Sequence, residues 1–396
     1  MKEIYFDHAA TTPVDPRVLE KMLPFFAENF GNPNSQHLFG RRAVEAVDAA
    51  RDEVARLLGA KPSEIYFTSG GTESDNWAMR GAAHANAHRG RHLVVSRIEH
   101  PAMLSTAKEL EKEGFEVTYV PVDEYGRVDT EAFAAALRAD TVFAGVMTAN
   151  NEIGTLQPVR ELYALCRARG IPFFTDAVQA AGILPVDASM ADMISLSGHK
   201  FYGPKGVGVL YVRTGLKLGK IVTGGHQERS MRGGTTNVPG VVGFAEALRL
   251  AVLERERDAA HERALRDRFV SRVLAEIPYV KYNGHPTERL PGNANFSFRY
   301  VEGESLLFSL DLAGIAVSSG SACSSGSLEP SHVLLATGMS EGLAHGSLRF
   351  SFGRHNTAEE VDLAVDRLKE IVVRLRALSP LFPKELKNEV YERKED

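Results

Sequence analysis

The feature that most constrains the fold of this chain is a regular alternation of strand-like and helix-like segments between residues 35 and 212. Short apolar runs typical of buried strands are separated by stretches whose apolar residues recur with helical spacing. This alternation predicts an α/β domain with a largely parallel sheet. Strand patterns lie at 64–68, 92–96, 116–120, 141–147, 171–175, 192–196 and 206–212, and helical patterns at 43–58, 102–113, 130–138 and 161–169. Ligands in such folds bind beyond the carboxyl ends of the strands, so we expect functional residues just after them.

The length of the chain predicts a second domain. A single core stops growing at roughly 250–300 residues, and this chain has 396. A helical pattern over 239–275 leads out of the α/β region, and the patterns beyond it no longer alternate regularly. Those later patterns are strands at 293–301, 315–318 and 347–352 and helices at 304–312 and 357–378. We predict a large domain over 16–258 with a mainly parallel mixed sheet, and a smaller α+β domain formed by 1–15 and 259–396.

Charge and cysteine content exclude several classes of protein. The formal net charge is −5 at pH 7, so no basic field is available to bind a nucleic acid or an anionic membrane. No apolar run reaches the ~18 residues that span a bilayer. Asp7 and His8 come too early for a signal peptide. Two cysteines, Cys166 and Cys323, are too few for a disulfide scaffold, and we expect a cytoplasmic protein.

Three loops that follow predicted strands carry chemically distinctive residues. In the first, Gly71 and Thr72 precede a helix expected to start near Ser74, and backbone N–H groups at a helix start attract phosphate. In the second, Asp176 ends a strand and can hold a protonated ring nitrogen. In the third, Lys200 is followed by an apolar, glycine-containing stretch that can desolvate its amine and make it nucleophilic.

Each loop also has an ordinary structural explanation. The first fits a plain strand-to-helix turn, Asp176 fits a helix N-cap, and Lys200 fits an exposed loop lysine. Together the three loops have the arrangement that pyridoxal phosphate requires: a lysine for the Schiff base, an aspartate for the pyridinium nitrogen and a cup for the phosphate.

The chain resembles the cysteine desulfurases of the NifS/IscS type, which are fold-type I enzymes dependent on pyridoxal phosphate. The resemblance is carried by motifs at 5–12, 31–35, 68–76, 150–154, 176–179, 195–208, 233–240, 318–330 and 348–354. It implies a fold-type I transferase that acts as a homodimer. It also implies that the enzyme takes sulfur from L-cysteine and leaves L-alanine and an enzyme persulfide.

The resemblance also implies roles for single residues. Lys200 would form the Schiff base, and His100 would stack on the cofactor ring and act in acid–base chemistry. Arg349 would bind the substrate carboxylate beside Asn151, a task that suits a planar two-pronged donor. The cofactor-binding residues that it implies are Gly71, Thr72, His100, Asn151, Asp176, Gln179, Ser197, His199, Lys200 and Thr235, the last reaching the phosphate of a partner subunit. Alternatively, His100 is a satisfied loop histidine and Arg349 a surface arginine at a strand end.

The two cysteines have contrasting surroundings. Cys323 lies among Ser, Ala and Gly residues, which predict an exposed, mobile loop over 318–330. A thiolate on such a loop can attack at the cofactor and then deliver sulfur elsewhere. The resemblance accordingly implies that Cys323 is the catalytic nucleophile. Cys166 follows Leu162 by one helical turn and is predicted to fill a core.

The long Cys323 loop resembles group I of the family, whose members pass sulfur to an iron–sulfur scaffold protein. We expect no intrinsic metal site, although Cys323 can contact an iron–sulfur cluster shared with such a partner. Within group I, residues 326–334 and 344–346 look more like the nitrogen-fixation branch. The segment 381–383 is a candidate scaffold contact.

Several alternatives remain open. An aminotransferase or a selenocysteine lyase of the same fold is the nearest enzymatic one. A non-catalytic assembly partner with a purely structural cofactor site is another. A metal-binding protein would use His84, His88 and His92, which are spaced four residues apart. Gly90 interrupts that helical pattern, so a solvated face is expected instead.

Overall fold

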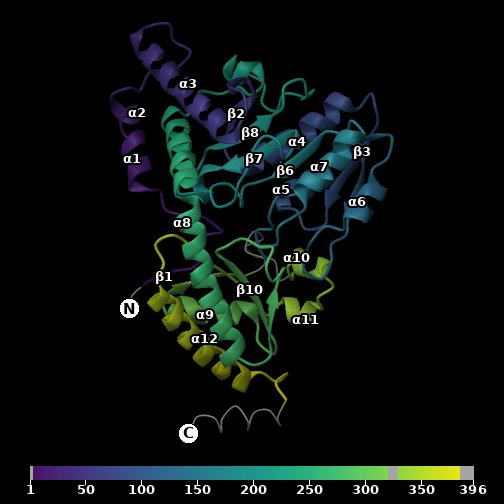
Figure 1. Cartoon of the computed structure of the whole chain (residues 1–396), viewed down its shortest axis with the longest axis vertical. Coiled ribbons are helices and arrows are strands. Elements are labelled where there is room, and N and C mark those ends of the chain that lie inside the picture. Colours follow the sequence, from purple (N-terminus) through teal and green to yellow (C-terminus); the bar gives the residue numbers. More distant parts are fainter. Residues whose placement is uncertain (1–2, 320–328, 384–396) are drawn as a thin grey trace.

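A single long helix, α8 (Val238–Glu276), runs along the molecule and connects two sheets (Figure 1). The computed structural model describes residues 3–319 and 329–383. The first half of α8 packs against α3 (Leu38–Leu58) and α1 (Pro16–Met22), and its second half packs against α12 (Ala358–Leu378). The predicted boundary between residues 258 and 259 therefore falls inside one continuous helix.

The larger sheet has seven strands, and only one of them runs against the others. The order is β2 (Ile65–Thr68), β8 (Gly208–Val212), β7 (Met193–Ser197), β6 (Phe173–Asp176), β5 (Thr141–Gly145), β3 (His92–Ser96) and β4 (Glu116–Val120). β8 pairs antiparallel with β2 and β7, and the other neighbours are parallel. The prediction of a mainly parallel mixed sheet is confirmed, and all seven strands fall within two residues of their expected bounds.

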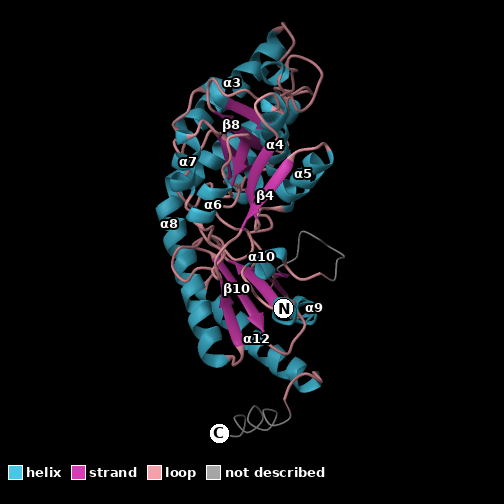
Figure 2. Ribbon diagram, turned by 90° about the vertical axis from the view of Figure 1, so that its right-hand side faces the viewer, coloured by secondary structure: helices cyan, strands magenta, loops and turns pink. Residues whose placement is uncertain are grey.

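Helices cover both faces of this sheet, which is why its central strands are buried along their whole length. Side chains alternate between two cores: Leu93 and Val95 enter one, and Val94 enters the other. One core lies under α4 (Gly71–Asn86) and α5 (Pro101–Lys112). The other lies under α3, α6 (Thr130–Ala136), α7 (Val159–Ala168) and the first half of α8. Figure 2 shows the two layers of helices on either side of the strands.

The smaller sheet is antiparallel and is built largely from the C-terminal part of the chain. Its order is β12 (Ser318–Ser319), β13 (Ser347–Ser351), β10 (Asn293–Phe298) and β9 (Val280–Asn283). At the N-terminus, β1 (Ile4–Tyr5) pairs parallel with β11 (Ile315–Ala316), and Asp7 bridges to Ser351. α9 (Gly303–Leu312), α12 and the second half of α8 supply a core with Phe6, Phe269 and Phe350.

Some elements were not predicted from the sequence. They are α1, α2 (Pro24–Ala27), β1, β9, α10 (His332–Ala336) and α11 (Glu341–Ala344). The expected start of α4 near Ser74 is wrong, because the helix begins at Gly71. Gly70 has φ +154°, a conformation that side chains rarely adopt, and this turn lets the helix begin directly after β2.

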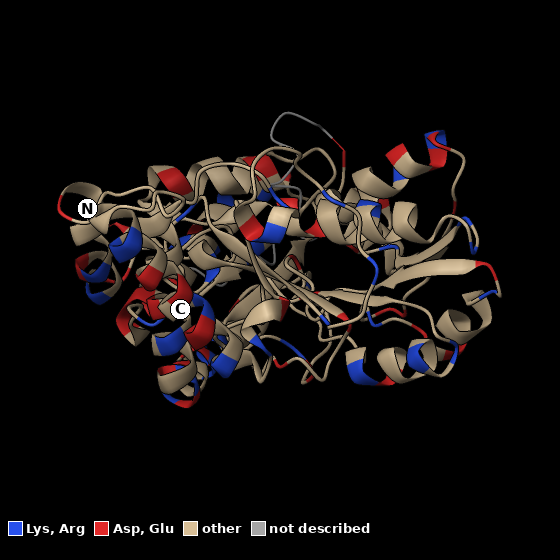
Figure 3. Cartoon of the chain, turned by 90° about the horizontal axis from the view of Figure 1, so that it is seen from above, with Lys and Arg blue, Asp and Glu red and all other residues tan. Residues whose placement is uncertain are grey.

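The described helices include none with the length and apolar character needed to cross a bilayer. Basic and acidic residues are interspersed along the surface helices in Figure 3, in keeping with the small net charge.

Phe269 is expected to be a major source of stability in the smaller core. It is fully buried, and its ring centroid lies 4.5 Å from that of Phe350 and 5.5 Å from that of Phe352. Phe269→Ala should lower the free energy of unfolding by about 3–5 kcal/mol through lost burial and a residual cavity. Phe308→Ala, at a phenylalanine that is 64% exposed on α9, should change it by less than about 0.5 kcal/mol. Equal losses in urea unfolding would contradict this view of the core.

Candidate active site

The predicted site residues lie where strands of the larger sheet end. β2, β3, β5, β6 and β7 run in the same direction, so their carboxyl ends lie along one edge. The segments that leave this edge contain Gly71 after β2, His100 after β3, Asn151 after β5, Asp176 at the end of β6 and Ser197 to Lys200 at the end of β7. The larger sheet thus brings five separate parts of the chain to one place.

The start of α4 forms a cup in which backbone approaches backbone. A Cβ added at Gly71 would lie 2.7 Å from Val178 Cγ2, and one added at Gly208 would lie 2.6 Å from the Gly70 Cα. The Ser197 Oγ lies 3.7 Å from the place where a Cβ on Gly70 would be. The first N–H groups of a helix have no partner within it and attract an anion. Glycines, a hydroxyl and a helix start therefore fit a phosphate group.

His199 stands beside this cup as a neutral donor or acceptor. Its Nδ1 lies 3.1 Å from Thr11 Oγ1. Burial, followed by the nearby charges of Lys200 and Lys205, lowers the pKa of His199 to about 4. The imidazole is therefore uncharged at neutral pH, and it contributes hydrogen bonding to the cup.

Asp176 is a buried carboxyl at the end of β6. It is 6% exposed, and its Oδ1 accepts a hydrogen bond from the Val178 N–H at 2.8 Å. Burial raises the pKa of Asp176, while the charges of His100 and Lys200 oppose that rise. A buried carboxylate is favourable only when a cation or several donors face it. A protonated pyridine nitrogen is a partner of that kind, so the residue fits the ring of pyridoxal phosphate.

His100 caps α5 through one of its ring nitrogens. Its Nδ1 accepts from the Ala102 N–H at 3.2 Å, which assigns the proton of the neutral ring to Nε2. Burial lowers the pKa of His100, Asp176 acts in the opposite direction, and Lys200 lowers it further. His100 therefore both caps α5 and interacts electrostatically with Asp176.

The amine of Lys200 lies against the N-terminal segment of the chain. Its Nζ donates to the carbonyl oxygens of Ala9 at 2.6 Å and Ala10 at 2.9 Å. The Gln179 amide also donates to the Ala9 oxygen, at 3.0 Å. The Thr12 N–H and hydroxyl both donate to the His199 carbonyl oxygen, at 3.0 Å. Residues 9–12 therefore form one wall of the site, a contribution that the three-loop prediction did not include.

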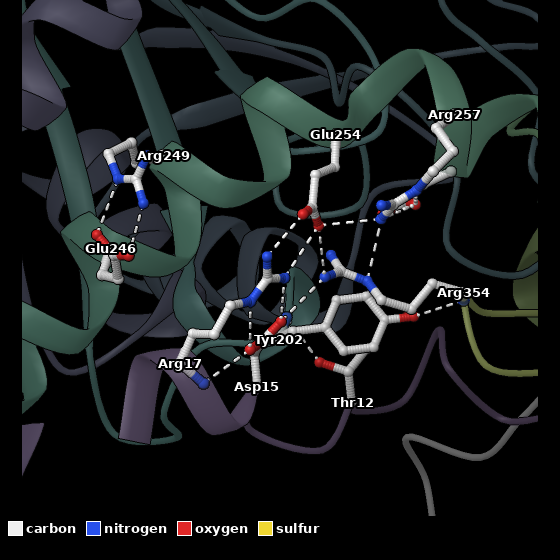
Figure 4. A network of polar contacts seen from close by, with 10 residues as sticks. Thr12, Asp15, Arg17, Tyr202, Glu246, Arg249, Glu254, Arg257 and Arg354 are labelled. Atoms are coloured by element: carbon white, nitrogen blue, oxygen red, sulfur yellow. Dashed lines mark hydrogen bonds and ion pairs between the residues drawn. The ribbon is translucent and has the colours of Figure 1, made fainter. Parts of the chain in front are cut away.

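A network of ion pairs fastens the segment that carries Lys200 (Figure 4). The Arg354 guanidinium lies 3.8 Å from the centre of the Tyr202 ring, and the Tyr202 hydroxyl accepts a hydrogen bond from the backbone N–H of Arg354. Arg354 also contacts Asp15 and Glu254, each at 3.2 Å, and Arg17 pairs with the same two carboxylates. The network joins the start of α1, helix α8 and the end of β13 to the residues after Lys200.

Arg349 is not the surface arginine that was left open as an alternative. It is 3% exposed on β13. Its Nη1 donates to the Asn151 carbonyl oxygen and its Nη2 to Asp7 Oδ1, each at 2.9 Å. Its Nε is buried and has no hydrogen-bond partner within the described ranges. Arg349 and Asp7, both beside the smaller sheet, therefore form an ion pair next to the Asn151 carbonyl of the larger region. One donor of Arg349 is still to be satisfied, as a carboxylate ligand would require.

Glu152 and Glu99 hold the beginning of α10 against this region. Ser331 donates to Glu152, and His332 Nε2 lies 3.1 Å from the Glu99 carbonyl oxygen. Both carboxyls are fully enclosed, and burial raises the pKa of Glu152 to about 7 and that of Glu99 to about 8. Glu152 follows Asn151 directly, so these contacts tie the segment after residue 328 to the predicted substrate site.

The remaining predicted residues differ in what the structure says of them. Thr235 lines a hollow together with Ser69, and an ion pair between Arg232 and Glu73, at 2.8 Å, ties its segment to α4. Cys323 lies outside the described residues. Cys166 is fully buried on α7, where burial raises the pKa of its thiol to about 12, so its predicted role as a core residue is confirmed.

The histidine series does not share one helix face. α4 ends at Asn86, before His88 and His92. The expectation of a solvated face is wrong for His92, which is buried on β3 between hydroxyls of Thr118 and Thr141, each at 2.8 Å.

Sequence reasoning passed over several residues that shape the site. Ala9 and Ala10 act through their carbonyl oxygens, which carry no side-chain signal. Asp7 and Glu152 stand inside motifs that had been used only to recognise the family. The signal that could have identified Asp7 and Glu152 was the presence of a charged residue inside a motif that resembles the family.

Comparisons with known proteins agree with this geometry. Residues 4–364 match the family model described as aminotransferase class-V. The chain is 52% identical over 386 residues to a protein named cysteine desulfurase IscS from Methanosarcina thermophila, covering 97% of this chain and 95% of that protein. It is 50% identical over 381 residues to a protein of the same name from Dictyoglomus turgidum, covering 96% and 97%.

Solved structures show the same architecture. A NifS-like protein superposes with a TM-score of 0.88 at 40% identity, covering 94% of this chain and 99% of that one. SspA in complex with cysteine superposes with a TM-score of 0.78 at 35% identity, covering 90% and 100%.

Fold and site together define a member of the aminotransferase class-V family with the fold-type I architecture. Within that family, the chain belongs to the cysteine desulfurases of the NifS/IscS type. The resemblance seen in the sequence is confirmed.

A cavity beside Lys200 is lined by another buried carboxyl, Glu262 on α8. The cavity is also lined by His8, Tyr202 and Arg354. Burial, with a smaller contribution from Asp258, raises the pKa of Glu262 to about 8. The folded chain therefore keeps this proton at pH values at which an unfolded glutamate has released it.

This difference in pKa between the folded and the unfolded chain predicts that Glu262 makes the free energy of unfolding depend on pH. The unfolded state binds fewer protons than the folded state between the two pKa values, so wild-type stability falls as the pH rises toward about 8. Glu262→Gln removes that loss. The free energy of unfolding of the variant, relative to wild type, should rise by about 1–3 kcal/mol between about pH 5 and about pH 8.

Urea unfolding at both pH values measures the effect. Glu256→Gln, at an exposed glutamate on the same helix, should show no such rise. A flat difference for Glu262→Gln would show that Glu262 ionises normally in the fold.

Proposed function

We propose that this chain is a cysteine desulfurase that uses pyridoxal phosphate to take sulfur from L-cysteine, leaving L-alanine and a persulfide on Cys323. The observation that carries the proposal is the meeting of the buried Asp176 carboxyl, the Lys200 amine and the cup at Gly71 on one edge of the sheet. The names of the relatives and the cysteine complex of SspA support the choice of substrate.

The residues around this edge match the parts of the cofactor one by one. When bound, pyridoxal phosphate supplies an aldehyde that links to amino groups and a ring that accepts electrons from a substrate carbanion. Lys200 would carry the aldehyde, Asp176 would face the ring nitrogen and Gln179 the ring hydroxyl, with His100 stacked on the ring beside Asn151. The phosphate would be held by Gly71, Thr72, Ser197 and His199, and by Thr235 from a partner subunit.

Lys200 is well placed to move the α-proton of the substrate. When it is not joined to the cofactor, its Nζ would serve as the base that takes up this proton. The carbonyl oxygens of Ala9 and Ala10 accept hydrogen bonds from Nζ and favour its charged form, so they stabilise the proton after it has been taken up. The neutral His100 can then donate the proton on its Nε2.

In the sulfur-transfer step, the Cys323 thiolate would attack the substrate sulfur. A new S–S bond forms, the carbon–sulfur bond of the substrate breaks, and its electron pair stays on carbon. That carbon takes up a proton and becomes the methyl group of alanine. The sulfur taken from the substrate stays bonded to the Cys323 sulfur as the persulfide. The thiolate is the reactive form because a neutral thiol is a weak nucleophile.

We further propose a homodimer that passes its sulfur to an iron–sulfur scaffold protein. The role implied for Thr235 is a contact with the cofactor phosphate of a second copy of the chain, and this contact requires a dimer. The exposed side chains of Leu23, Phe26 and Phe30, which are 57%, 60% and 64% accessible, supply apolar area for a partner chain. The IscS names of the relatives and the long Cys323 segment favour the scaffold as acceptor. A cytoplasmic location and the nitrogen-fixation branch remain predictions from the sequence.

Two enzymes of the same fold are the alternatives. An aminotransferase would convert the bound cofactor to its amine form and would need no cysteine nucleophile. A selenocysteine lyase would act faster on selenocysteine than on L-cysteine. Alanine formed in equal amount to transferred sulfur, with L-cysteine as the better substrate, distinguishes the proposal from both.

Arg349 should control substrate binding. Arg349→Lys keeps the charge and loses the fork that contacts Asn151 and Asp7. We expect KM for L-cysteine to rise by roughly ten- to a hundred-fold with a smaller change in kcat, because a charge-assisted pair is weakened. Arg299→Lys, at an exposed arginine just after β10, is the control. An unchanged KM for Arg349→Lys would place the substrate carboxylate elsewhere.

The two cysteines allow a matched test of the nucleophile. One turnover with L-cysteine, followed by mass spectrometry of the digested protein, should show a gain of one sulfur atom on the Cys323 peptide. Cys323→Ala should abolish this gain and the release of alanine, whereas Cys166→Ala should retain both, because Cys166 is buried on α7. Normal alanine release by Cys323→Ala would contradict the assignment.

A further inference from the structure

Asp75 is a buried carboxyl that the proposed reaction does not use. It lies on α4 one turn from the cup and is 1% exposed. Its carboxyl oxygen Oδ1 lies 2.7 Å from the Ser195 hydroxyl. Among the described residues no lysine, arginine or histidine forms an ion pair with Asp75. A buried carboxyl of this kind needs either a contact that compensates its charge or a bound proton, since an isolated buried charge is costly.

The same Ser195 hydroxyl also reaches the cofactor-facing carboxyl. Ser195 lies opposite Asp176 in the pairing of β7 with β6, and its Oγ is 3.5 Å from Asp176 Oδ1. α4 packs across both strands and so places Asp75 on the other side of Ser195. The three side chains therefore form a chain of carboxyl, hydroxyl and carboxyl.

This chain cannot be satisfied when both carboxyls are ionised. One hydroxyl carries one proton and can donate to only one carboxylate at a time. Two charges would also repel each other in a water-excluded site. If Asp75 holds a proton, Asp75 donates to Ser195 Oγ, and the Ser195 hydroxyl donates to Asp176. The proton of Asp75 and the proton of Ser195 then each have an acceptor, and the negative charge rests on Asp176.

We propose that Asp75 is a positioning residue that stays protonated and, through Ser195, supplies a hydrogen bond that keeps Asp176 anionic toward the cofactor ring. The proposal rests on the proposed function, because that function gives Asp176 its partner. Burial, and then the charges of Asp176 and Glu99, raise the pKa of Asp75, which agrees with the geometry. The titratable groups that interact with Asp176 are His100, Lys200, Asp75 and Glu99.

Three variants distinguish the effect of the Asp75 proton from the effect of side-chain packing. Asp75→Asn keeps a donor toward Ser195, as the protonated acid has. Asp75→Ala removes that donor, and Ser195→Ala removes the hydroxyl. Asn86→Ala is the control, because Asn86 is also buried on α4 but bonds to the Ala82 carbonyl oxygen, away from Asp176. Thermal unfolding of each variant reports the general effect on packing.

The measured quantity is the dissociation constant for pyridoxal phosphate, titrated into the cofactor-free protein across a range of pH. We expect Ser195→Ala to weaken binding by roughly ten-fold, as the loss of a hydrogen bond to a charged group does. Asp75→Ala should weaken binding in the same direction, because Ser195 loses the donor that orients its hydroxyl toward Asp176. The acid limb of binding, which reports protonation of Asp176, should move upward by about one pH unit. Asp75→Asn should bind within about three-fold of wild type, and Asn86→Ala should leave the limb in place.

Other results overturn the proposal. If Asp75 were ionised, Asp75→Asn and Asp75→Ala would both remove a negative charge and move the acid limb downward. If Asp75 acted only through packing, Asp75→Ala would lower the melting temperature and leave the acid limb unmoved.

Infrared difference spectra of the cofactor-free protein keep this test apart from the proposed function. At neutral pH, the difference spectra of wild type minus Asp75→Asn and wild type minus Asp75→Ala should each show the carbonyl band of one protonated carboxyl, because the bands of Glu99 and Glu262 are common to all three proteins and cancel. If that band is present and wild type binds no pyridoxal phosphate, the proposed function fails and the protonated Asp75 stands. If the band is absent, the proposal about Asp75 fails whatever the protein binds.

Discussion

The burial of the Asp176 carboxyl at the end of β6 is the constraint on which the rest of the site depends. A charge in that position is tolerated only with partners, and the fold gathers them from neighbouring strands. Ser195 comes from β7, His100 from the segment after β3, and Lys200 from the turn after β7. A sheet with all these strands in one direction presents their carboxyl ends together, so the fold itself concentrates the chemistry.

The second sheet completes the site from the other side. Arg349 on β13 contacts both Asn151 of the larger region and Asp7 near the N-terminus. Arg354, a few residues further, stacks on Tyr202 and pairs with Asp15 and Glu254. The N-terminal strand pairs with the smaller sheet before residues 9–12 pass beside Lys200. The proposed substrate-binding and cofactor-binding residues are therefore held by polar contacts between the two sheet regions and the N-terminal segment, and α8 takes part through Glu254.

Much of this arrangement could be predicted from the sequence, because patterns of burial leave a clear signal. The apolar runs of β3 and β4 and the end of α3 at Leu58 were placed to the residue, whereas α3 begins at Leu38, five residues before its expected start. Lys200 and Asp176 were found because charged residues that follow buried strands are conspicuous. The partners of these residues were harder to find. Backbone carbonyls such as that of Ala9 leave no trace in a side-chain pattern, and the contact of Asp7 with Arg349 spans 342 residues. Short elements such as α2, with four residues, carry too few periods to be recognised.

The central claim is that Lys200 binds the aldehyde of pyridoxal phosphate while Asp176 faces the ring nitrogen. The most direct measurement is to load the protein with pyridoxal phosphate, reduce it with borohydride, digest it and locate the cofactor by mass spectrometry. The account predicts that the cofactor is attached to Lys200 in wild type, and that Lys200→Ala carries none. Attachment to the exposed Lys205 instead, or no attachment at all, would contradict the account.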